Sequence, residues 1–470
     1  MFLSWAQFVF DEIVWPRWQS VLGLVLAAAA VSVMVRERRG RSNIMAWMFF
    51  ILFLPVLGAL CFLLFGGRKH LRSVALKRAI NSVAGVITTG QREGVAEGGN
   101  SFELLGDEGG MAAWEALCAE IESARESIHI TTYILGCDRV GRELVRRLAA
   151  RARAGVRVRL LVDAVGSWGA RLRVCGPLVA AGGEVLRFMP VVTLTGRRGG
   201  ANFRNHRKMA VFDGQRAVVG GQNLGARYMG PAVSKGRYRD FSVRVCGPVV
   251  AGLTRIFLSD WCFASGESPE RYREQLRFSP GAAGAVRMEV VGSGPDVPGD
   301  PLWERFVGLI QECRGGITLV TPYLVPDEVL FRVLLAKVRA GKRVRLIVPR
   351  RSDHPFLDLA RRPYLRALHG AGAEVLLYDG DEGEGMLHGK LFLVDKGVGV
   401  VGSANLDMRS LFVNFEVALV IHSPNVVRRL RVLEAELVAN CVPYAGSGLE
   451  VSNWRNGVLE ALAHVVGPLL

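Results

Sequence analysis

Paired cysteines are missing from this 470-residue sequence. Its eight cysteines are scattered along the chain, and none forms the CxxC spacing that is typical of zinc sites. So few cysteines in so long a chain do not indicate a dense disulfide framework either. We therefore interpret them as reduced core cysteines of a protein that faces the cytosol, namely Cys61, Cys118, Cys137, Cys175, Cys246, Cys262, Cys313 and Cys441.

Acidic residues are also in short supply. Asp and Glu number 43 against 59 Lys and Arg, which leaves a net charge of +16. This imbalance predicts an anionic partner, and a nucleic acid, a phosphate-bearing ligand and an acidic membrane surface all fit it. Because 50% of the residues are hydrophobic, which is high for a soluble protein, we expect part of the chain to lie in lipid.

Charge is absent from the 22 residues of Ile44–Phe65. A helix of that length spans about 33 Å, enough for a hydrocarbon core of about 30 Å. An earlier apolar run, Val21–Val35, extends back toward Trp18. We expect a transmembrane helical hairpin within residues 1–70, with spans near 18–35 and 44–65. A shallow or re-entrant first segment is the alternative, whereas a cleaved signal peptide conflicts with the acidic residues Asp11 and Glu12.

A hairpin places both ends of the chain on one side of a membrane. Six basic residues flank it on that side and four lie in its loop, which places the large C-terminal part of the chain in the cytoplasm by the positive-inside rule. A polar, glycine-rich stretch follows, and we place a linker at residues 71–101.

The remainder of the chain is an internal duplication, with halves at 102–285 and 286–470. ITTYILGCD, from Ile130, matches VTPYLVPDE, from Val320, and GVRVRLLVDAVGS, from Gly155, matches GKRVRLIVPRRSD, from Gly341. In each half, short apolar runs rich in β-branched residues alternate with helical patterns. This alternation predicts two pseudo-symmetric α/β sandwich halves, each with a sheet covered by helices on both faces.

One longer pattern, H-x-K-x4-D-x6-G-[GS]-x-N, occurs once in each half. Its two histidines are 182 residues apart, close to the offset of the other matched blocks. A lone HxK is common by chance, but two full copies inside a duplication are not. The first copy contains His206, Lys208, Asp213, Gly220, Gly221 and Asn223, and the second contains His388, Lys390, Asp395, Gly402, Ser403 and Asn405.

This spacing suits a phosphate site. Residues two positions apart in a strand face the same side, so each copy presents an imidazole and an ammonium together, while Arg207 and Gly389 point away. One imidazole can attack phosphorus while the other protonates the leaving alkoxide, a mechanism that needs no metal or cofactor. The amide donors and the glycine-containing pairs complete the expected phosphate-binding set, which is Asn223, Asn405, Ser403 and Gly221.

The paired motifs resemble those of the phospholipase D superfamily, and the resemblance covers about Phe102 to the C-terminus. It implies that His206 is the nucleophile and His388 the acid and base, and that the motif aspartates, Asp213 and Asp395, are structural. It also implies a carboxylate behind each imidazole. We expect Asp240 in YRDFSVRV to orient His206 and Glu416 in FVNFEVAL to orient His388.

A narrower resemblance is to bacterial cardiolipin synthases, in the segments RNHRK, GGQN, YRDFSVRVCGP and TPYLVPDE and in the apolar hairpin. It implies that two phosphatidylglycerols are joined into cardiolipin with release of glycerol, at the bacterial plasma membrane. Both substrates are anionic lipids, which agrees with the positive net charge. Nucleic acid is not expected as a partner, and the sequence leaves the oligomeric state open.

The motifs alone do not separate this transferase from a hydrolytic phospholipase D or from a headgroup-exchange enzyme. A nuclease is a more distant alternative, because it gives the apolar hairpin no purpose, and a catalytically dead scaffold conflicts with two intact motifs. Three further features fit substrate contacts and ordinary surface or packing positions alike: the basic loop Thr195–Arg207, His354 and Trp168.

Overall fold

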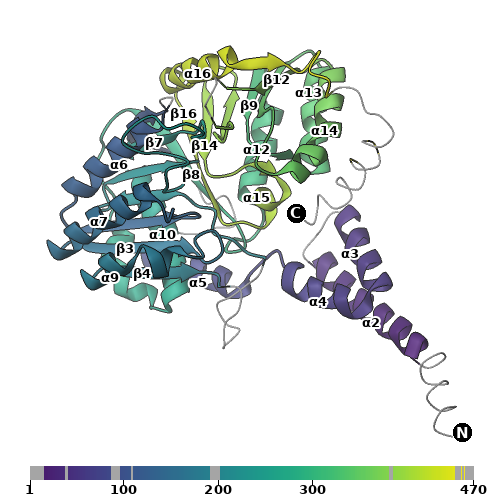
Figure 1. Cartoon of the computed structure of the whole chain (residues 1–470), viewed down its shortest axis with the longest axis horizontal. Coiled ribbons are helices and arrows are strands. Elements are labelled where there is room, and N and C mark those ends of the chain that lie inside the picture. The colour runs from purple at the N-terminus through teal and green to yellow at the C-terminus, as the bar shows by residue number, and fades with distance from the viewer. Residues whose placement is uncertain are drawn as a thin grey trace, which may run out of the picture.

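The computed structural model describes residues 15–36, 41–85, 96–106, 109–190, 202–380 and 385–449, together with Gly457 and Glu460. A 15-stranded sheet runs through both halves of this described part. The first half, coloured blue to teal, lies beside the second, coloured green to yellow, and the purple N-terminal helices project away from both (Figure 1).

The sheet of the first half has a parallel outer part and an antiparallel inner part. Its strand order from the outer edge is β4-β3-β2-β5-β6-β7-β1, in which β2, β3 and β4 are parallel to one another and the remaining pairs are antiparallel. The strands are β1 (Glu97–Leu105), β2 (Ser127–Thr132), β3 (Arg157–Asp163), β4 (Glu184–Phe188), β5 (Met209–Phe212), β6 (Arg216–Gly220) and β7 (Ser242–Cys246).

The second half repeats this order as β12-β11-β9-β13-β14-β16-β8, with β17 added at the outer edge. The first strand of each half, β1 and β8, pair antiparallel at the centre of the sheet. This correspondence, strand for strand, confirms the two α/β halves predicted from the duplicated blocks. The strands are β8 (Val286–Ser293), β9 (Gly316–Val320), β11 (Arg343–Pro349), β12 (Glu374–Tyr378), β13 (Leu391–Val394), β14 (Val398–Gly402), β16 (Glu416–His422) and β17 (Cys441–Pro443), and β10 (Leu324–Val325) pairs with β15 (Leu406–Asp407) in a separate two-stranded sheet.

Helices cover the sheet and join its strands. Asp138 and Asp327 cap the equivalent helices α7 and α13 by accepting from backbone N–H groups of the first turn, a favoured way to begin a helix. Helix α10 is buried along most of its length, and its side chains share one hydrophobic core with β7, β13 and β16. The two halves are therefore packed through a continuous apolar interior. The helices are α6 (Met111–Ser123), α7 (Arg139–Arg153), α8 (Ala170–Arg173), α9 (Gly176–Ala180), α10 (Val249–Ser265), η2 (Pro269–Tyr272), α11 (Arg273–Arg277), α12 (Pro301–Glu312), α13 (Glu328–Arg339), α14 (Pro355–Gly370), α15 (Met408–Phe412) and α16 (Pro424–Ala439).

The stretch predicted as a linker, 71–101, is largely regular structure. Helix α5 (Leu71–Ala84) packs against α10, and β1 begins at Glu97, while residues 86–95 lie outside the described part. The helix is capped at its start by the side chain of His70 and ends at Gly85 in a left-handed conformation. The linker prediction was wrong here because the glycine-rich composition begins only after this helix.

The predicted membrane hairpin is also divided differently. Its first segment lies in α2 (Trp15–Arg36), but the second is split into α3 (Arg41–Phe53) and α4 (Pro55–Phe65). Pro55 has no N–H to continue the helix, and Leu54 before it leaves the helical conformation, so one uninterrupted span at 44–65 was wrong. Across the described ranges, no helix is both long enough and apolar enough to cross a membrane.

Candidate active site

Each HxK segment enters the site just before a strand and pairs with the opposite half. The N–H of His206, ahead of β5, donates to the carbonyl of Phe415 at 2.9 Å. The N–H of His388, ahead of β13, donates to the carbonyl of Arg239 at 2.8 Å. Because these contacts are related by the pseudo-twofold arrangement, they bring both motifs to the seam between the halves.

The same pairing crosses the carboxylates between the halves. Nδ1 of His206 lies 2.8 Å from Oε1 of Glu416, and Nδ1 of His388 lies 2.6 Å from Oδ2 of Asp240. The predicted assignment, Asp240 to His206 and Glu416 to His388, was therefore wrong. Both residues contact a motif imidazole, but each half holds the histidine of the other.

The Gly-Gly and Gly-Ser pairs support these carboxylates rather than a phosphate. The hydroxyl of Ser403 donates to Glu416 Oε2, and its N–H donates to the Val417 carbonyl at 2.9 Å. The N–H of Gly221, at the equivalent position, donates to the Phe241 carbonyl at 3.1 Å, and a Cβ there would overlap Asp240. Because both N–H groups are occupied, the phosphate-binding role predicted for these two residues was wrong.

The motif lysines are buried beside the histidines. Lys208 Nζ donates to the His206 carbonyl at 2.8 Å, and Lys390 Nζ lies 3.2 Å from His388 Nε2. Burial lowers the pKa of Lys208 to about 7 and the pKa of Lys390 to about 8. An anion in the same site would therefore raise the pKa of each lysine and favour its charged form.

Both imidazoles are held in the tautomer that a nucleophile or base requires. Burial lowers the pKa of each histidine, and the pKa of His388, which also lies beside Lys390, falls to about 4. Burial pushes the pKa of Glu416 upward, but the charge and hydrogen bond of His206 outweigh it and the pKa ends below its ordinary value. An ionised carboxylate only accepts, so Nδ1 carries the proton and Nε2 presents a lone pair at neutral pH.

The two motif asparagines, Asn223 and Asn405, are both buried. The side-chain oxygen of Asn223 accepts from the Ile134 N–H at 3.1 Å, and its side chain also hydrogen-bonds with Tyr228, which packs against His388. The Oδ1 of Asn405 has no hydrogen-bond partner among the described residues. Phosphate binding by these two amides stays a prediction.

The motif aspartates lie at the far end of their strands from the histidines. Asp213, with a φ of 52°, accepts from the N–H groups of Glu126 at 2.8 Å and Ser127 at 3.0 Å. Asp395, with a φ of 53°, accepts in the same way from Gly316 at 3.0 Å. Both fasten the turn after the motif strand to the start of the neighbouring strand, so their role is structural, as the resemblance implies.

A buried charge cluster anchors the first motif from behind. Arg207 is fully buried and points away from the site, as the strand alternation predicts, with Nη1 2.5 Å from Asp260 and Nη2 3.0 Å from Asp296. Lys77 of α5 lies 3.7 Å from the same Asp296. Gly389 replaces this arginine in the second motif, where a Cβ would lie 2.6 Å from the Phe241 ring. The two motifs are thus positioned by different means.

Aromatic side chains that the sequence did not single out line the imidazoles. The Tyr133 ring packs edge-on against His206 at 5.2 Å between centroids, and the Tyr228 ring packs against His388 at 5.3 Å. Tyr238 stacks on His388 at 5.7 Å. Tyr133 belongs to a duplicated block, and that repetition was the available signal for it.

The remaining sequence features fall in three places. Of the basic loop, residues 195–201 lie outside the described part, while Arg204 lies 3.3 Å from Asp163 and Arg207 lies in the buried cluster. Trp168 is 70% exposed and carries Arg187 over its ring. His354 is exposed and packs against Tyr323. The two described arginines are therefore structural.

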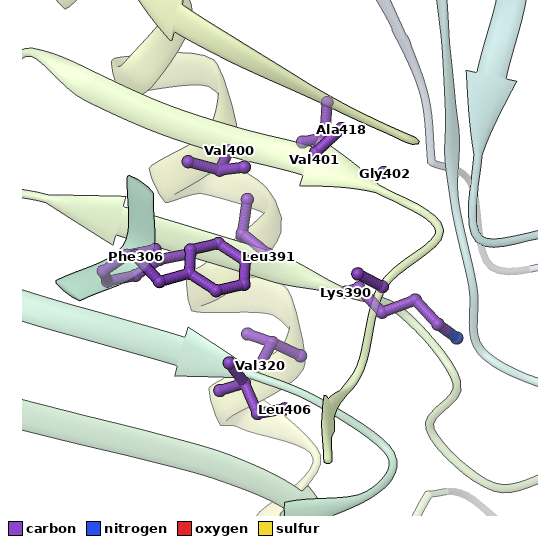
Figure 2. A pocket seen from close by; sticks show the side chains of 11 residues that line it. Phe306, Val320, Lys390, Leu391, Val400, Val401, Gly402, Leu406 and Ala418 are labelled. Carbon is purple, nitrogen blue, oxygen red and sulfur yellow. The ribbon is translucent and has the colours of Figure 1, made fainter. Parts of the chain in front are cut away.

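A small pocket lies in the core behind each motif lysine. Figure 2 shows the one in the second half, where Phe306, Val320 and Val400 form part of the lining and the Lys390 ammonium points away from it. The equivalent pocket in the first half lies behind Lys208. Since the ammonium leaves the pocket and most of the lining is apolar, this pocket offers little to bind an anion.

Two like halves that each contribute a histidine, a lysine and a carboxylate to one buried seam fit the class of enzymes that transfer phosphoryl-linked groups. Similarity to known protein families identifies the enzyme more closely. A family model described as "Cardiolipin synthase, PLD-like domain" matches residues 117–243 and 306–435, and one described as "Phospholipase_D-nuclease N-terminal" matches residues 24–67.

Curated relatives match most of the chain. The cardiolipin synthase of Oceanobacillus iheyensis is 33% identical over 87% of this chain and 91% of its own length. The major cardiolipin synthase of Bacillus subtilis is 31% identical over 87% and 89%. The chain therefore belongs to the family of phospholipase D-like cardiolipin synthases. This membership confirms the class of enzyme predicted from the motifs, a phosphatidyltransferase of the cardiolipin synthase type.

Among solved structures, the phosphatidylserine synthase of Haemophilus influenzae superposes with a TM-score of 0.62 at 14% identity, over 84% of this chain and all of that one. At this identity the match shows a shared fold.

Proposed function

We propose that the protein transfers a phosphatidyl group from one phosphatidylglycerol to another, and so produces cardiolipin and free glycerol. The observation that carries this proposal is the crossed pair of His–carboxylate contacts, His206 with Glu416 and His388 with Asp240, each beside a buried lysine. Two imidazoles of the same tautomer at one seam suit a double displacement, in which one holds the phosphatidyl group while the other moves a proton.

In the first step, Nε2 of His206 attacks phosphorus and the bond from phosphorus to the glycerol oxygen breaks. Protonated His388 gives its proton to that oxygen, and glycerol leaves. Burial and the nearby Lys390 lower the pKa of His388 to about 4. An anionic phosphodiester between the motifs opposes both effects and favours the protonated imidazole.

In the second step, His388 takes the proton from a headgroup hydroxyl of a second phosphatidylglycerol. The resulting oxygen attacks phosphorus and the bond to His206 breaks, so that both histidines return to their starting states. The ammonium groups of Lys208 and Lys390 and the amides of Asn223 and Asn405 stabilise the charge on the non-bridging oxygens. The roles of the two histidines follow the family pattern.

The product assay uses purified protein in vesicles of phosphatidylglycerol that is labelled in its headgroup glycerol. We expect one glycerol released for each cardiolipin formed, and no product from His206→Ala or His388→Ala. His369→Gln, in α14 away from the seam, serves as the matched control and should retain activity. Phosphatidic acid as the sole product would contradict the transferase and indicate a hydrolase.

We also propose that the protein works at the bacterial plasma membrane, with its N-terminal helices as a multi-pass anchor and its catalytic halves in the cytoplasm. Large apolar side chains of α2, α3 and α4 are exposed in the isolated chain, among them Leu24 at 60% and Phe53 at 79%. An exposed apolar surface of this kind suits lipid. The break at Pro55 makes α3 and α4 a kinked second arm of the hairpin.

The topology is tested with a cysteine placed at Val233, which is 75% exposed in the first half. A membrane-impermeant maleimide should label Val233→Cys only after the cells are lysed, whereas the native chain serves as the background control. Labelling in intact cells would place the catalytic halves outside.

A further inference from the structure

An aspartate outside both motifs lies next to the second histidine. Asp353, in the loop between β11 and α14, accepts a hydrogen bond from the Tyr323 hydroxyl at 2.5 Å and another from the Tyr238 hydroxyl at 3.2 Å. Tyr238 in turn stacks on the His388 ring at an interplanar angle of 27°. The carboxylate is therefore tied to the imidazole through a single aromatic side chain.

Asp353 remains open to a ligand. The residue is exposed, although the two tyrosines fix its orientation. Burial acts to raise its pKa, but the Tyr323 hydrogen bond and the nearby histidines outweigh this and keep the pKa below its ordinary value. An ionised carboxylate offers about four acceptor positions, and the tyrosines fill two of them. A ligand with hydroxyl groups could donate to the others.

The first half has no such group at the matching position. Ser167 corresponds to Asp353 in the duplicated blocks, and its hydroxyl is used by the backbone, since it donates to the Tyr133 carbonyl at 2.8 Å and accepts from the Leu135 N–H at 2.9 Å. Ser167 is also buried. Of these two matching positions, the one in the His388 half carries a carboxylate and the one in the His206 half does not. In the proposed function, an alcohol oxygen gains or loses its proton at His388.

We propose that Asp353, Tyr238 and Tyr323 form a subsite for the polyol headgroup of the alcohol that leaves or attacks beside His388. A glycerol headgroup has a second hydroxyl next to the reacting one, and that hydroxyl can donate to the carboxylate while the first lies at the imidazole. Arg227 lies over the Tyr238 ring at 5.5 Å and donates to its hydroxyl at 3.3 Å. This positive charge disfavours an ammonium-bearing headgroup in the same place.

This inference rests on the proposed transfer reaction, and the test separates the two. The purified enzyme in phosphatidylglycerol vesicles is given labelled glycerol and 1-propanol together, and the ratio of the two exchanged lipids is measured. The second hydroxyl is the difference that the subsite would recognise, because 1-propanol lacks it. We expect the native enzyme to favour glycerol by at least about tenfold, because 1-propanol cannot make the hydrogen bond to the charged carboxylate.

Asp353→Asn should lower this preference about tenfold, and Tyr323→Phe should lower it less because the carboxylate remains. Asp379→Asn, an exposed aspartate at the end of β12 that pairs with Arg350, is the matched control and should keep the native ratio. An unchanged ratio in Asp353→Asn would overturn the subsite, and so would an equal loss of both products, which indicates a merely structural role. Phosphatidic acid alone from the native enzyme would instead overturn the proposed function.

Discussion

Replacing Glu416 by Gln tests the crossed geometry at its strongest contact. The substitution keeps the size of the side chain but removes the charge 2.8 Å from His206 Nδ1. A full imidazolium at that distance is stabilised by about 6 kcal/mol at an effective dielectric constant of 20. If about half of a positive charge develops on the imidazole in the transition state, about 3 kcal/mol is lost, and kcat should fall by about 150-fold.

The direction of the pKa change identifies the partner. The carboxylate raises the pKa of His206, so Glu416→Gln should lower that pKa further and leave His388 unchanged, as measured by NMR of histidine-labelled protein. Asp240→Asn should do the reverse. Glu434→Gln removes another buried carboxylate and controls for a general loss of stability. A shift of His388 rather than His206 in Glu416→Gln, or full activity of that variant, would refute the reasoning.

Three further predictions concern the surroundings of the histidines. The pKa values of Lys208 and Lys390 are lowered to about 7 and about 8, so both lysines lose their protons as pH rises from about 6 to about 9. KM for anionic lipid should therefore rise several-fold over this range and be flat below about pH 6, and a KM independent of pH in steady-state assays would contradict this. Gly221→Ser should lower kcat at least tenfold in the product assay, since its Cβ would overlap Asp240, and native activity would contradict that overlap. Arg207→Met leaves two buried carboxylates without their main partner and should cost about 3–5 kcal/mol of unfolding free energy in a denaturant titration, whereas a loss below about 1 kcal/mol would argue against the buried cluster.

Local periodicity was enough to predict what each motif presents. His206 and Lys208 face the site while Arg207 is buried behind them, because side chains alternate along extended backbone such as that leading into β5. The duplicated blocks likewise predicted two equivalent halves, since each block corresponds to a strand and its following segment. These inferences needed no knowledge of how the halves meet.

The pairing of carboxylates could not be read from the sequence. Asp240 follows His206 and Glu416 follows His388 along the chain, so each half contains an apparently complete set. Only the placement of one half on the other, through the Phe415 and Arg239 carbonyls, decides that the sets are exchanged. Because this exchange depends on how the two halves pack together, the sequence pattern of neither half reveals it.

Three other errors came from reading composition and residue type without backbone and packing geometry. Hydropathy treats Ile44–Phe65 as one apolar segment, although Pro55 cannot donate the hydrogen bond that a continuous helix needs. For α5, the glycine-rich residues after it obscured a helix whose buried face includes Lys77 and Ile80. Gly221 was assigned to the phosphate, whereas its small size is explained by the neighbouring Asp240.

The most direct test of the central claim is to trap the phosphatidyl group on the protein. Phosphatidylglycerol labelled in its phosphate is mixed with the purified enzyme, the reaction is stopped within one turnover, and the labelled peptide is identified. One covalent, acid-labile and alkali-stable label per chain on His206 is the predicted result, with no label in His206→Ala. Label on His388 would reverse the two roles, and rapid formation of cardiolipin with no labelled protein would contradict the covalent double displacement.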